Sequence, residues 1–301
     1  MRVAVVIVNY GQWDLTREAL RSLREAAGVD LRVTLVDNCS PGEVPAWVGE
    51  SPDVRFERLA ENTGFAGGNN AGFRMSREDG ADYTFFLNND ARVAPDAVEA
   101  LAGFLETHGE AGIAAPAVYR ASEPGRLWSA GGNLVRWKMR FEQVAIPVEL
   151  FHTREGMSVD FVSGCALMIR SRLFEELGGF REEMFMYYED ADLCHRVRES
   201  GFTVMVVPSA MVVHDVASSS GGELSRLALY FSERNRLALS RRMLHPLFRS
   251  VFILYKTAVL LVLTAKFLVL GNPGLIRWMW RGYLDGIAGR TGYREVIGRL
   301  V

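Results

Sequence analysis

The sequence predicts an α/β fold, a mostly parallel sheet flanked by helices, followed by a helical and partly apolar C-terminal extension. In the first half of the chain, short apolar runs alternate with segments whose apolar residues recur every three or four positions. Polar residues follow several of these runs, and the last part of the chain combines basic charge with long apolar stretches. The 301 residues, 49% hydrophobic and 23% charged, suit roughly two globular domains and exclude a disordered or fibrous chain.

Each expected element rests on its hydrophobic period. Apolar runs predict strands and a helical period predicts helices, whereas residues 120–160 show no clear period and predict short strands and loops. Alternating strands and helices form a parallel sheet that binds ligands at the carboxyl ends of its strands. The expected strands are Val3–Val8, Val33–Val36, Val54–Leu59, Tyr83–Leu87, Ile113–Tyr119, Ala166–Ile169, Thr203–Val207 and Met211–His214. The expected helices are Leu15–Ala26, Gly67–Arg77, Asp96–Glu106, Asp190–Ser200 and Leu224–Met243.

Charge divides the chain unevenly. Residues 1–220 carry 21 Lys and Arg against 32 Asp and Glu, whereas residues 221–301 carry 13 against 4, a net of +9. We therefore expect a domain over residues 1–222 and a separate extension over residues 223–301. Because its basic residues are interleaved with apolar runs, the extension suits a membrane surface, and no nucleic-acid partner is expected.

The most apolar part of the extension, residues 251–270, has the roughly 20-residue length that crosses a bilayer. Lys256 and Lys266 interrupt it, and on a helical wheel Arg249 and Lys256 nearly align. We expect a helix that lies in the membrane interface with this polar edge toward the lipid headgroups. A spanning helix and a helix packed on the protein's own core are the alternatives.

The cysteines and the N-terminus indicate a reducing compartment. Cys39, Cys165 and Cys194 are far apart and form no CxxC pair, which argues against a zinc site and against a disulfide framework. The apolar run at the N-terminus is short and is broken at Asn9, so we interpret it as a buried strand rather than a signal peptide.

Two polar segments could hold a nucleotide. Asp37 and Asn38 end the second strand, where a carboxylate can accept hydrogen bonds from a ribose hydroxyl or a pyrimidine N–H, although an Asx turn is the alternative. The segment 61–70 contains three glycines within five residues. We expect a glycine-rich loop there that approaches a phosphate and leads into a helix, with a plain turn and helix cap as the alternative.

Two further residues have the chemistry of metal ligands. Asp90 follows an apolar strand, and a carboxylate there suits Mg²⁺ or Mn²⁺, which bind through one or two carboxylates and substrate phosphate oxygens. Capping of the following turn is the alternative role of Asp90. His214 ends the last short strand and could complete such a site or be structural.

The richest acidic cluster comprises Glu189, Asp190 and Asp192, which aromatic residues precede. Crowded carboxylates raise one another's pKa, and a raised pKa suits a general base. The alternative is that these residues favour the N-terminus of a helix through its dipole.

In this order, the segments resemble the inverting nucleotide-sugar glycosyltransferases of family 2, which have the GT-A fold. The resemblance covers residues 3 to about 240 and is closest to the bacterial rhamnosyltransferase-type branch. The matching segments are VVIVNYG (5–11), LVDNCSPG (35–42), ENTGFAGGNNAGF (61–73), FFLNNDARV (85–93), DFVSGCALMIRSRLFEELGGF (160–180), MYYEDADLCHRVRESG (186–201) and VVHDVASSSGG (212–222).

The resemblance implies a role for each matched residue. Asp190 matches the catalytic base, Glu189 would support it or touch the acceptor, and Asp90 with His214 would hold Mg²⁺ or Mn²⁺. The family's acidic motif often has a second aspartate where this chain has Asn88. The acceptor side would include Gly164 and Cys165. The nucleotide-sugar site would include Asn9, Tyr10, Asp37, Asn38, Asn62, Gly68, Asn69, Asn88 and Asn89.

The implied reaction is transfer of a sugar by single displacement to a hydroxyl of a bacterial cell-surface glycan or lipid-linked acceptor. Residues 1–119 would bind the donor, dTDP-rhamnose before a UDP-sugar, and residues 120–222 the acceptor. We expect a peripheral protein on the cytoplasmic side of the inner membrane, with a soluble cytoplasmic protein as the alternative and a homo-oligomer left open.

Two other classes remain as alternatives: a GT-A-like module that binds a nucleotide sugar without turnover, and a Rossmann dehydrogenase. No GxGxxG follows the first strand, which disfavours the dehydrogenase. The enzymatic interpretation requires that Asp90 and Asp190 converge on one pocket.

Overall fold

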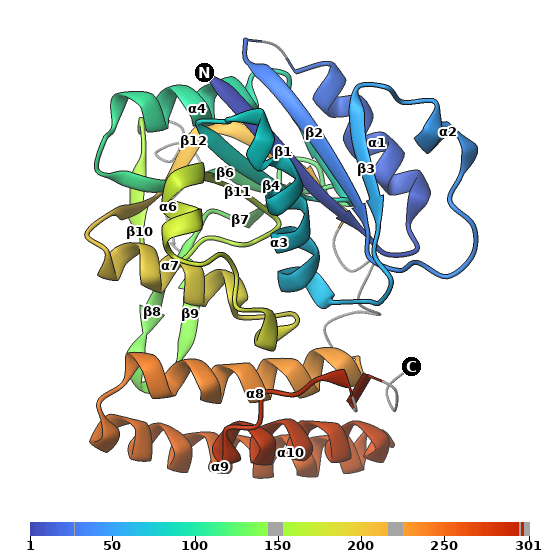
Figure 1. The fold of residues 1–301 in the computed structure, drawn as a ribbon. Coiled ribbons are helices and arrows are strands. Elements are labelled where there is room, and N and C mark those ends of the chain that lie inside the picture. Colours follow the sequence, from blue (N-terminus) through green and yellow to red (C-terminus); the bar gives the residue numbers. More distant parts are fainter. Residues whose placement is uncertain (27, 144–152, 216–224, 295, 298–301) are drawn as a thin grey trace. The chain divides into compact units, whose positions relative to one another are not determined.

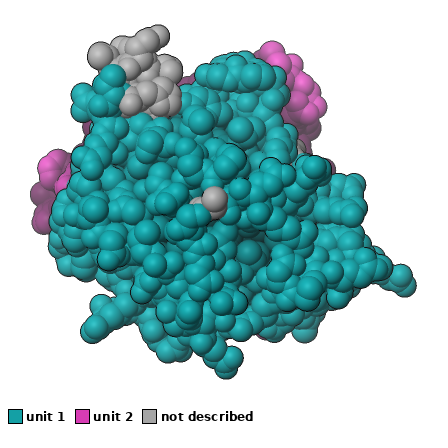
Figure 2. Space-filling view, turned by 90° about the horizontal axis from the view of Figure 1, so that it is seen from above, with its two compact units in different colours: residues 1–133, 143–182, 190–216 teal, residues 134–142, 183–189, 217–301 magenta. Residues whose placement is uncertain are grey.

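The computed structural model describes residues 1–26, 28–143, 153–215, 225–294 and 296–297. The chain forms two compact units, shown in teal and magenta in Figure 2. Unit 1 comprises residues 1–133, 143–182 and 190–216, and unit 2 comprises residues 134–142, 183–189 and 217–301. The boundary expected between residues 222 and 223 lies outside the described residues, as do residues 216–222 of the last matched segment.

Unit 1 is built on one mixed sheet (Figure 1). Its main strands follow the order β10-β12-β6-β11-β4-β1-β2-β3, while β5 pairs with β12 and β7 with β6. The pairs β1–β2, β1–β4, β2–β3 and β6–β12 are parallel, and β11 is antiparallel to both of its neighbours. The strands are β1 (Arg2–Asn9), β2 (Asp30–Asp37), β3 (Val54–Arg58), β4 (Tyr83–Asn88), β5 (Ala91–Val93), β6 (Ala111–Arg120), β7 (Leu127–Ser129), β10 (Met157–Val159), β11 (Ala166–Arg170) and β12 (Thr203–His214).

Helices cover both faces of this sheet, which confirms the predicted α/β class (Figure 1). The helices of unit 1 are α1 (Trp13–Arg24), α2 (Ala46–Gly49), α3 (Gly64–Ser76), α4 (Ala97–Thr107), α6 (Ser171–Glu176) and α7 (Glu189–Glu199). Short 3₁₀ turns follow at Arg77–Asp79 and Glu182–Met184. The last two expected strands form one strand, β12, whose pairing with β6 shifts between Val207 and Met211.

Alternation along β1 explains why the sheet has two buried faces. Val3, Val5 and Ile7 pack in the same core as α1 and α4, whereas Val6 packs in the core formed by α3, α6 and α7. The strand is therefore apolar on both faces, as in other sheets covered by helices on both sides. Its last residue, Asn9, is polar and lies at the carboxyl edge of the sheet.

The glycine-rich segment does not form the expected loop. Helix α3 begins at Gly64, three residues before the expected start, and includes Gly67, Gly68 and Gly72. A Cβ on Gly68 would lie 2.7 Å from Val8 Cγ1, and one on Gly72 would lie 3.1 Å from Val36 Cγ2. These two glycines are therefore needed because the helix backbone packs directly on the sheet.

Unit 2 contains a helical group and part of a small hairpin. Its helices are α8 (Arg226–Met243), α9 (Pro246–Val269) and α10 (Pro273–Ala288), and the hairpin strands are β8 (Gly132–Val135) and β9 (Arg140–Gln143), joined by a turn at Arg136–Lys138. Ser225 caps α8 by accepting a hydrogen bond from the Ala228 N–H. Gly286 of α10 faces the backbone of α8, since a Cβ there would lie 2.9 Å from the Arg234 carbonyl oxygen.

Helix α9 is the one helix, among the described residues, that is long and apolar enough to cross a membrane. Its lysine at position 256 is buried and contacts Glu233 of α8, with Nζ 2.8 Å from Oε1. The expectation that Lys256 faces lipid headgroups is therefore wrong, because a helical wheel does not tell which side of a helix packs on protein. Burial and the nearby Arg236 lower the pKa of Lys256.

The close packing of α3 on the sheet leads to a testable prediction. We expect Gly72→Ala to lower the free energy of unfolding by about 1–3 kcal/mol, because the added methyl meets Val6 and Val36, whose branched side chains move little. Gly103→Ala in α4 is the matched control, since its Cβ meets no atom within 4 Å and should add about 0.4–1 kcal/mol. Urea unfolding measures both, and equal effects would contradict the packing argument.

Candidate functional site

Asp90 and His214 meet although 124 positions separate them. Asp90 lies between β4 and β5, and His214 ends β12. The antiparallel pairing of β5 with β12 sets Ala91 opposite His214, and the Asp215 N–H donates to the Asp90 carbonyl oxygen at 2.9 Å. His214 Nε2 lies 3.0 Å from Asp90 Oδ1, and both side chains are buried. Strand register therefore creates this carboxylate–imidazole pair.

The pair offers two of the ligands that a divalent cation needs. The described residues contain no group of three or more His, Cys, Asp or Glu side chains placed to hold an ion. Mg²⁺ and similar ions often bind one or two protein carboxylates and take their other ligands from water and substrate phosphates. His214 Nδ1 is buried, and no hydrogen-bond partner for it occurs among the described residues. The donor set thus fits an ion that arrives together with an anionic substrate.

Asp190 is the second residue of α7, and backbone N–H groups hold its half-buried carboxyl group. Oδ2 accepts a hydrogen bond from the Gly164 N–H at 2.9 Å, and Oδ1 accepts one from the Ala191 N–H at 2.8 Å. Burial raises the pKa of Asp190 to about 6, although these N–H groups act to lower it. A carboxyl group with this pKa can take up a proton near neutral pH, as a general base does.

A short segment links the two acidic centres. Gly164 donates to Asp190, and the next residue, Cys165, accepts a hydrogen bond on its carbonyl oxygen from the Asn88 N–H at 2.8 Å. Burial, with a contribution from the charge of Asp90, raises the pKa of the Cys165 thiol. Gly164 must lack a side chain, because a Cβ would lie 2.9 Å from Phe65 Cζ. Asp190 therefore contacts Gly164, and Asp90 lies near the next residue, Cys165.

The predicted nucleoside residues form a buried hydrogen-bond network around Asn9. The Asn9 amide oxygen accepts from the Thr16 hydroxyl at 2.9 Å and from Asn89 Nδ2 at 3.3 Å, and its Nδ2 donates to the Ser40 hydroxyl at 3.1 Å. Asn9 is fully buried, and its hydrogen bonds hold the side chains of Thr16, Ser40 and Asn89 in place. Its direct contact with a nucleoside stays a prediction.

Asp37 is held in a similar way at the end of β2. One carboxylate oxygen accepts hydrogen bonds from the Ser40 N–H and hydroxyl, and Arg58 Nε lies 3.3 Å from the other. Arg58 also donates to the carbonyl oxygens of Ser40 and Gly42. Ser40 lies in the matched segment 35–42, whereas sequence reasoning missed Arg58, because an arginine at the end of an exposed strand has no distinguishing motif.

The start of α3 is tied to the end of β2. Asn38 Nδ2 donates to Asn62 Oδ1 at 3.1 Å and to the Gly64 carbonyl oxygen at 2.9 Å, and its Oδ1 accepts from the Thr63 N–H. Asn62 Oδ1 accepts in turn from the Gly64 N–H. Asn38 and Asn62, each predicted as a residue of the nucleotide-sugar site, are thus brought together, and their contacts fix where α3 begins.

The remaining predicted residues occupy varied surroundings. Asn69 is buried and donates to the Phe65 carbonyl oxygen, whereas Tyr10 is 39% exposed at the end of β1. Glu189 is buried at the first position of α7. Asp192 is fully buried between two arginines, with Oδ2 3.0 Å from Arg181 Nε and 2.7 Å from Arg196 Nε. Asp192 therefore has a structural role.

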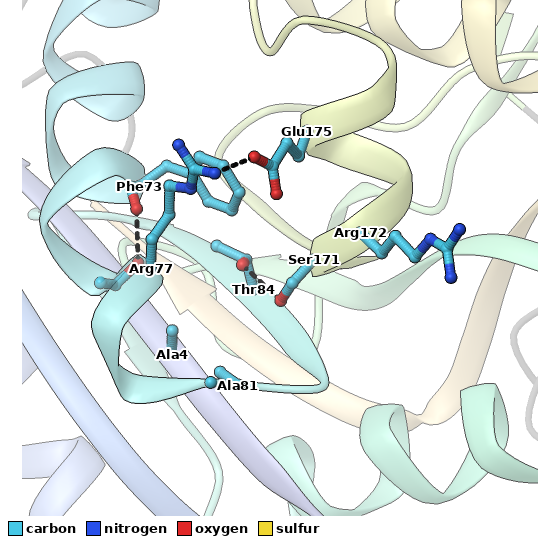
Figure 3. Close-up of a pocket in the computed structure, with 10 residues that line it drawn as sticks. Ala4, Phe73, Arg77, Ala81, Thr84, Ser171, Arg172 and Glu175 are labelled. Atoms are coloured by element: carbon cyan, nitrogen blue, oxygen red, sulfur yellow. Dashed lines mark hydrogen bonds and ion pairs between the residues drawn. The ribbon is translucent and has the colours of Figure 1, made fainter.

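A cavity of about 370 Å³ lies at the opposite edge of the sheet (Figure 3). It is lined by residues near the amino ends of β1 and β4, including Ala4 and Thr84, and by Arg77, Ser171 and Glu175. Figure 3 shows the Arg77–Glu175 ion pair and the 2.9 Å contact between the Thr84 and Ser171 hydroxyls. This ion pair and this hydrogen bond satisfy the polar groups of the cavity wall, so the polar edge near Asp90 and Asp190 remains the candidate site.

The sequence is similar to those of known proteins. Glycosyl transferase family 2 matches residues 4–178. The N-acetylglucosaminyl-diphospho-decaprenol L-rhamnosyltransferase of Mycobacterium tuberculosis is 30% identical over 237 residues, 72% of this chain and 77% of its own. The dTDP-rhamnosyl transferase RfbF of Shigella flexneri is 26% identical over 305 residues, 96% of this chain and 97% of its own.

A solved structure shows the same fold. The mannosyltransferase from Pyrobaculum calidifontis, in complex with GDP-Man and Mn²⁺, has a TM-score of 0.60 at 14% identity, covering 96% of this chain and 88% of that one. This similarity confirms the GT-A type of fold. The family match extends over more than half of the sequence. The chain therefore belongs to glycosyltransferase family 2 and is a glycosyltransferase that uses a nucleotide sugar.

Proposed function

We propose that this glycosyltransferase moves a sugar to a hydroxyl group of a lipid-linked or cell-surface glycan, with inversion at the anomeric carbon. The observation that carries the proposal is the environment of Asp190. Its carboxyl group has a pKa of about 6, is held by two backbone N–H groups, and flanks the same short segment as Asp90. These are the properties expected of a general base beside a leaving-group site.

Asp190 carries out the proton transfer in this proposal. Its carboxylate takes the proton of the acceptor hydroxyl while that oxygen forms a bond to the anomeric carbon. The bond between the anomeric carbon and the diphosphate oxygen breaks, and the diphosphate leaves with the electron pair. The Gly164 and Ala191 N–H groups fix the orientation of the carboxylate throughout. Attack from the face opposite the nucleotide gives inversion.

Asp90 and His214 are the residues proposed to hold a divalent cation. His214 Nε2 and Asp90 Oδ1 lie 3.0 Å apart in a buried position, so both would contact a single cation bound between them. When bound, such an ion supplies positive charge that offsets the charge of the leaving diphosphate. The Mn²⁺ in the related mannosyltransferase structure supports this assignment.

The relatives suggest the donor and the acceptor. Two of them are named as rhamnosyltransferases, one for dTDP-rhamnose and one for a diphospho-decaprenol lipid. We therefore propose dTDP-rhamnose as the donor, with a UDP-sugar as the alternative, and a polyprenyl-diphosphate-linked sugar as the acceptor. The second candidate is a module that binds the donor without turnover. Such a module would bind dTDP and show no sugar transfer.

Attachment of unit 2 to a membrane surface completes the proposal. One side of α9 packs within unit 2 through residues such as Phe252, Lys256 and Leu260, so α9 is not apolar all round. The other side is an exposed apolar stripe between 53% and 73% accessible, made of Leu247, Phe248, Val251, Leu254, Leu261, Val262 and Leu268. A helix with one buried and one apolar exposed side suits the interface between headgroups and acyl chains. The net charge of +9 over residues 221–301 favours anionic lipids.

The general-base role predicts a pH profile. The carboxylate form of Asp190 is the active form, so we expect the transfer rate to fall as the pH drops through about 6 and to level off above it. The rate is measured with dTDP-rhamnose and a polyprenyl-linked acceptor at saturating concentrations. Asp190→Asn should remove transfer by at least about a hundredfold while dTDP still binds. A variant with near-normal transfer would exclude Asp190 as the base.

The metal site predicts a change in nucleotide affinity. We expect Mn²⁺ to strengthen dTDP binding to the wild-type protein by about tenfold or more, and Asp90→Asn to lose this gain, because one of two protein ligands is removed. Calorimetry measures the affinity, and electron paramagnetic resonance counts bound Mn²⁺ without any turnover. Asp215→Asn is the matched control, since Asp215 pairs with Arg92 at 2.6 Å. An undiminished Mn²⁺ effect in Asp90→Asn would remove Asp90 from the site.

The exposed stripe predicts vesicle binding. We expect the wild-type protein to float with vesicles of phosphatidylglycerol and phosphatidylethanolamine, and the double variant Leu254→Asp, Leu261→Asp to stay in solution, because two charges enter the apolar stripe. Met211→Asp places the same charge at an exposed apolar residue of unit 1 and should leave flotation unchanged. Flotation of the double variant at the wild-type level would contradict attachment through α9.

A further inference from the structure

The segment that precedes the Glu189–Asp190 pair has an unusual backbone. Phe185, Tyr187 and Tyr188 all have positive φ angles, of 63°, 66° and 71°. Side chains disfavour this left-handed region, and the described residues contain only two other such positions outside glycine. Strained backbone of this kind persists only where surrounding contacts enforce it, and it concentrates at functional sites.

Helix α8 supplies those contacts through Arg234 and Asn235. Asn235 Nδ2 donates to the carbonyl oxygens of Met184, Met186 and Tyr187 at 2.8–2.9 Å. The Arg234 guanidinium donates to the Glu183 carbonyl oxygen at 2.6 Å and to that of Met184 at 3.1 Å. Arg234 Nε also donates to Asn235 Oδ1, so the two side chains orient each other.

This arrangement satisfies the carbonyl groups that the strained backbone leaves outside any helix or sheet. The turn around Phe185 is tight, with the Met186 N–H donating to the Met184 carbonyl oxygen at 2.7 Å. The Phe185 ring anchors the turn by stacking on Phe231 of α8 at 5.0 Å and contacting Tyr293 at 4.8 Å.

Burial of Arg234 is the second independent observation. Its side chain is 2% exposed, and burial lowers its pKa because a buried charge is unfavourable. A buried guanidinium is explained by acceptors that need it, and Arg234 donates mainly to main-chain carbonyl oxygens, those of Glu183, Met184 and Thr291 among them. Stabilisation of α8 alone would not require an arginine there, since a buried apolar side chain of similar volume packs as well.

We propose that Arg234 and Asn235 are positioning residues for the transfer reaction, which hold residues 183–188 in the backbone conformation that sets the start of α7. The inference rests on the proposed function, because Asp190 follows this segment after a single residue. Both residues act through the main chain and touch neither the donor nor the reacting hydroxyl. The positive φ angles of residues 185, 187 and 188 are therefore needed to place the start of α7, where Asp190 lies.

The test is Asn235→Ala, compared with Ser240→Ala on the same helix. Ser240 is equally buried, but its hydroxyl donates to Leu237 within α8, so it controls for the loss of a buried polar group. We expect Asn235→Ala to lower kcat by about tenfold or more, while KM for dTDP-rhamnose and the Kd for dTDP with Mn²⁺ stay within about twofold. We expect Ser240→Ala to leave all three unchanged. Hydrogen exchange of the amides of residues 184–188 should accelerate only in Asn235→Ala.

Two outcomes would overturn the proposal. One is a normal kcat in Asn235→Ala together with faster exchange, and the other is unchanged exchange in this segment. If Asn235→Ala does not fold, Asn235→Ser, which retains one donor, takes its place under the same criteria. Failure of the proposed function is recognised separately, because the wild-type protein would then show no transfer while the exchange difference would persist.

Discussion

Backbone hydrogen bonds between β5 and β12 bring the carboxylate and the imidazole of the candidate metal site together. The register of this pairing sets Ala91 opposite His214, and so Asp90 comes within 3.0 Å of His214 although β4 and β12 are not neighbours in the sheet. A slip of one residue would turn His214 to the other face of the sheet. The geometry of the site is thus determined by a three-residue strand, which pairs with β12 and is also tied to α1 by the hydrogen bond from the Val93 N–H to the Ser22 hydroxyl.

The asparagines of this edge act mainly as a scaffold. The side-chain amide of Asn89 donates hydrogen bonds to Asn9 and Thr16, and that of Asn38 donates to the Gly64 carbonyl oxygen at the start of α3. Such networks are effective only when every member is satisfied, and then they restrict the site to one arrangement. The Asp190 carboxyl group is different, because its partners are main-chain N–H groups that leave it able to accept a proton. Fixed surroundings and one titratable group near neutrality are what acid–base chemistry requires.

The sequence predicted the strands and helices of unit 1 well, because apolar runs and helical periods are local properties. It also predicted the residues at the edge of the sheet, since parallel strands share their carboxyl ends. The glycines of α3 were misinterpreted, because a glycine needed for close packing on Val8 looks the same as one needed in a loop. The partners Arg58 and Asn235 were missed, because each depends on contacts with segments that are distant in the sequence.

The buried pair of Lys256 and Glu233 also governs how the C-terminal helices can move. If α9 separated from α8 to cross a bilayer alone, it would carry an uncompensated ammonium group into hydrocarbon and leave an unpaired carboxylate behind. Breaking such a pair costs about 3–5 kcal/mol before any lipid is considered. In the proposed attachment, α8 and α9 therefore meet a lipid surface as one packed unit, with the Lys256–Glu233 pair intact.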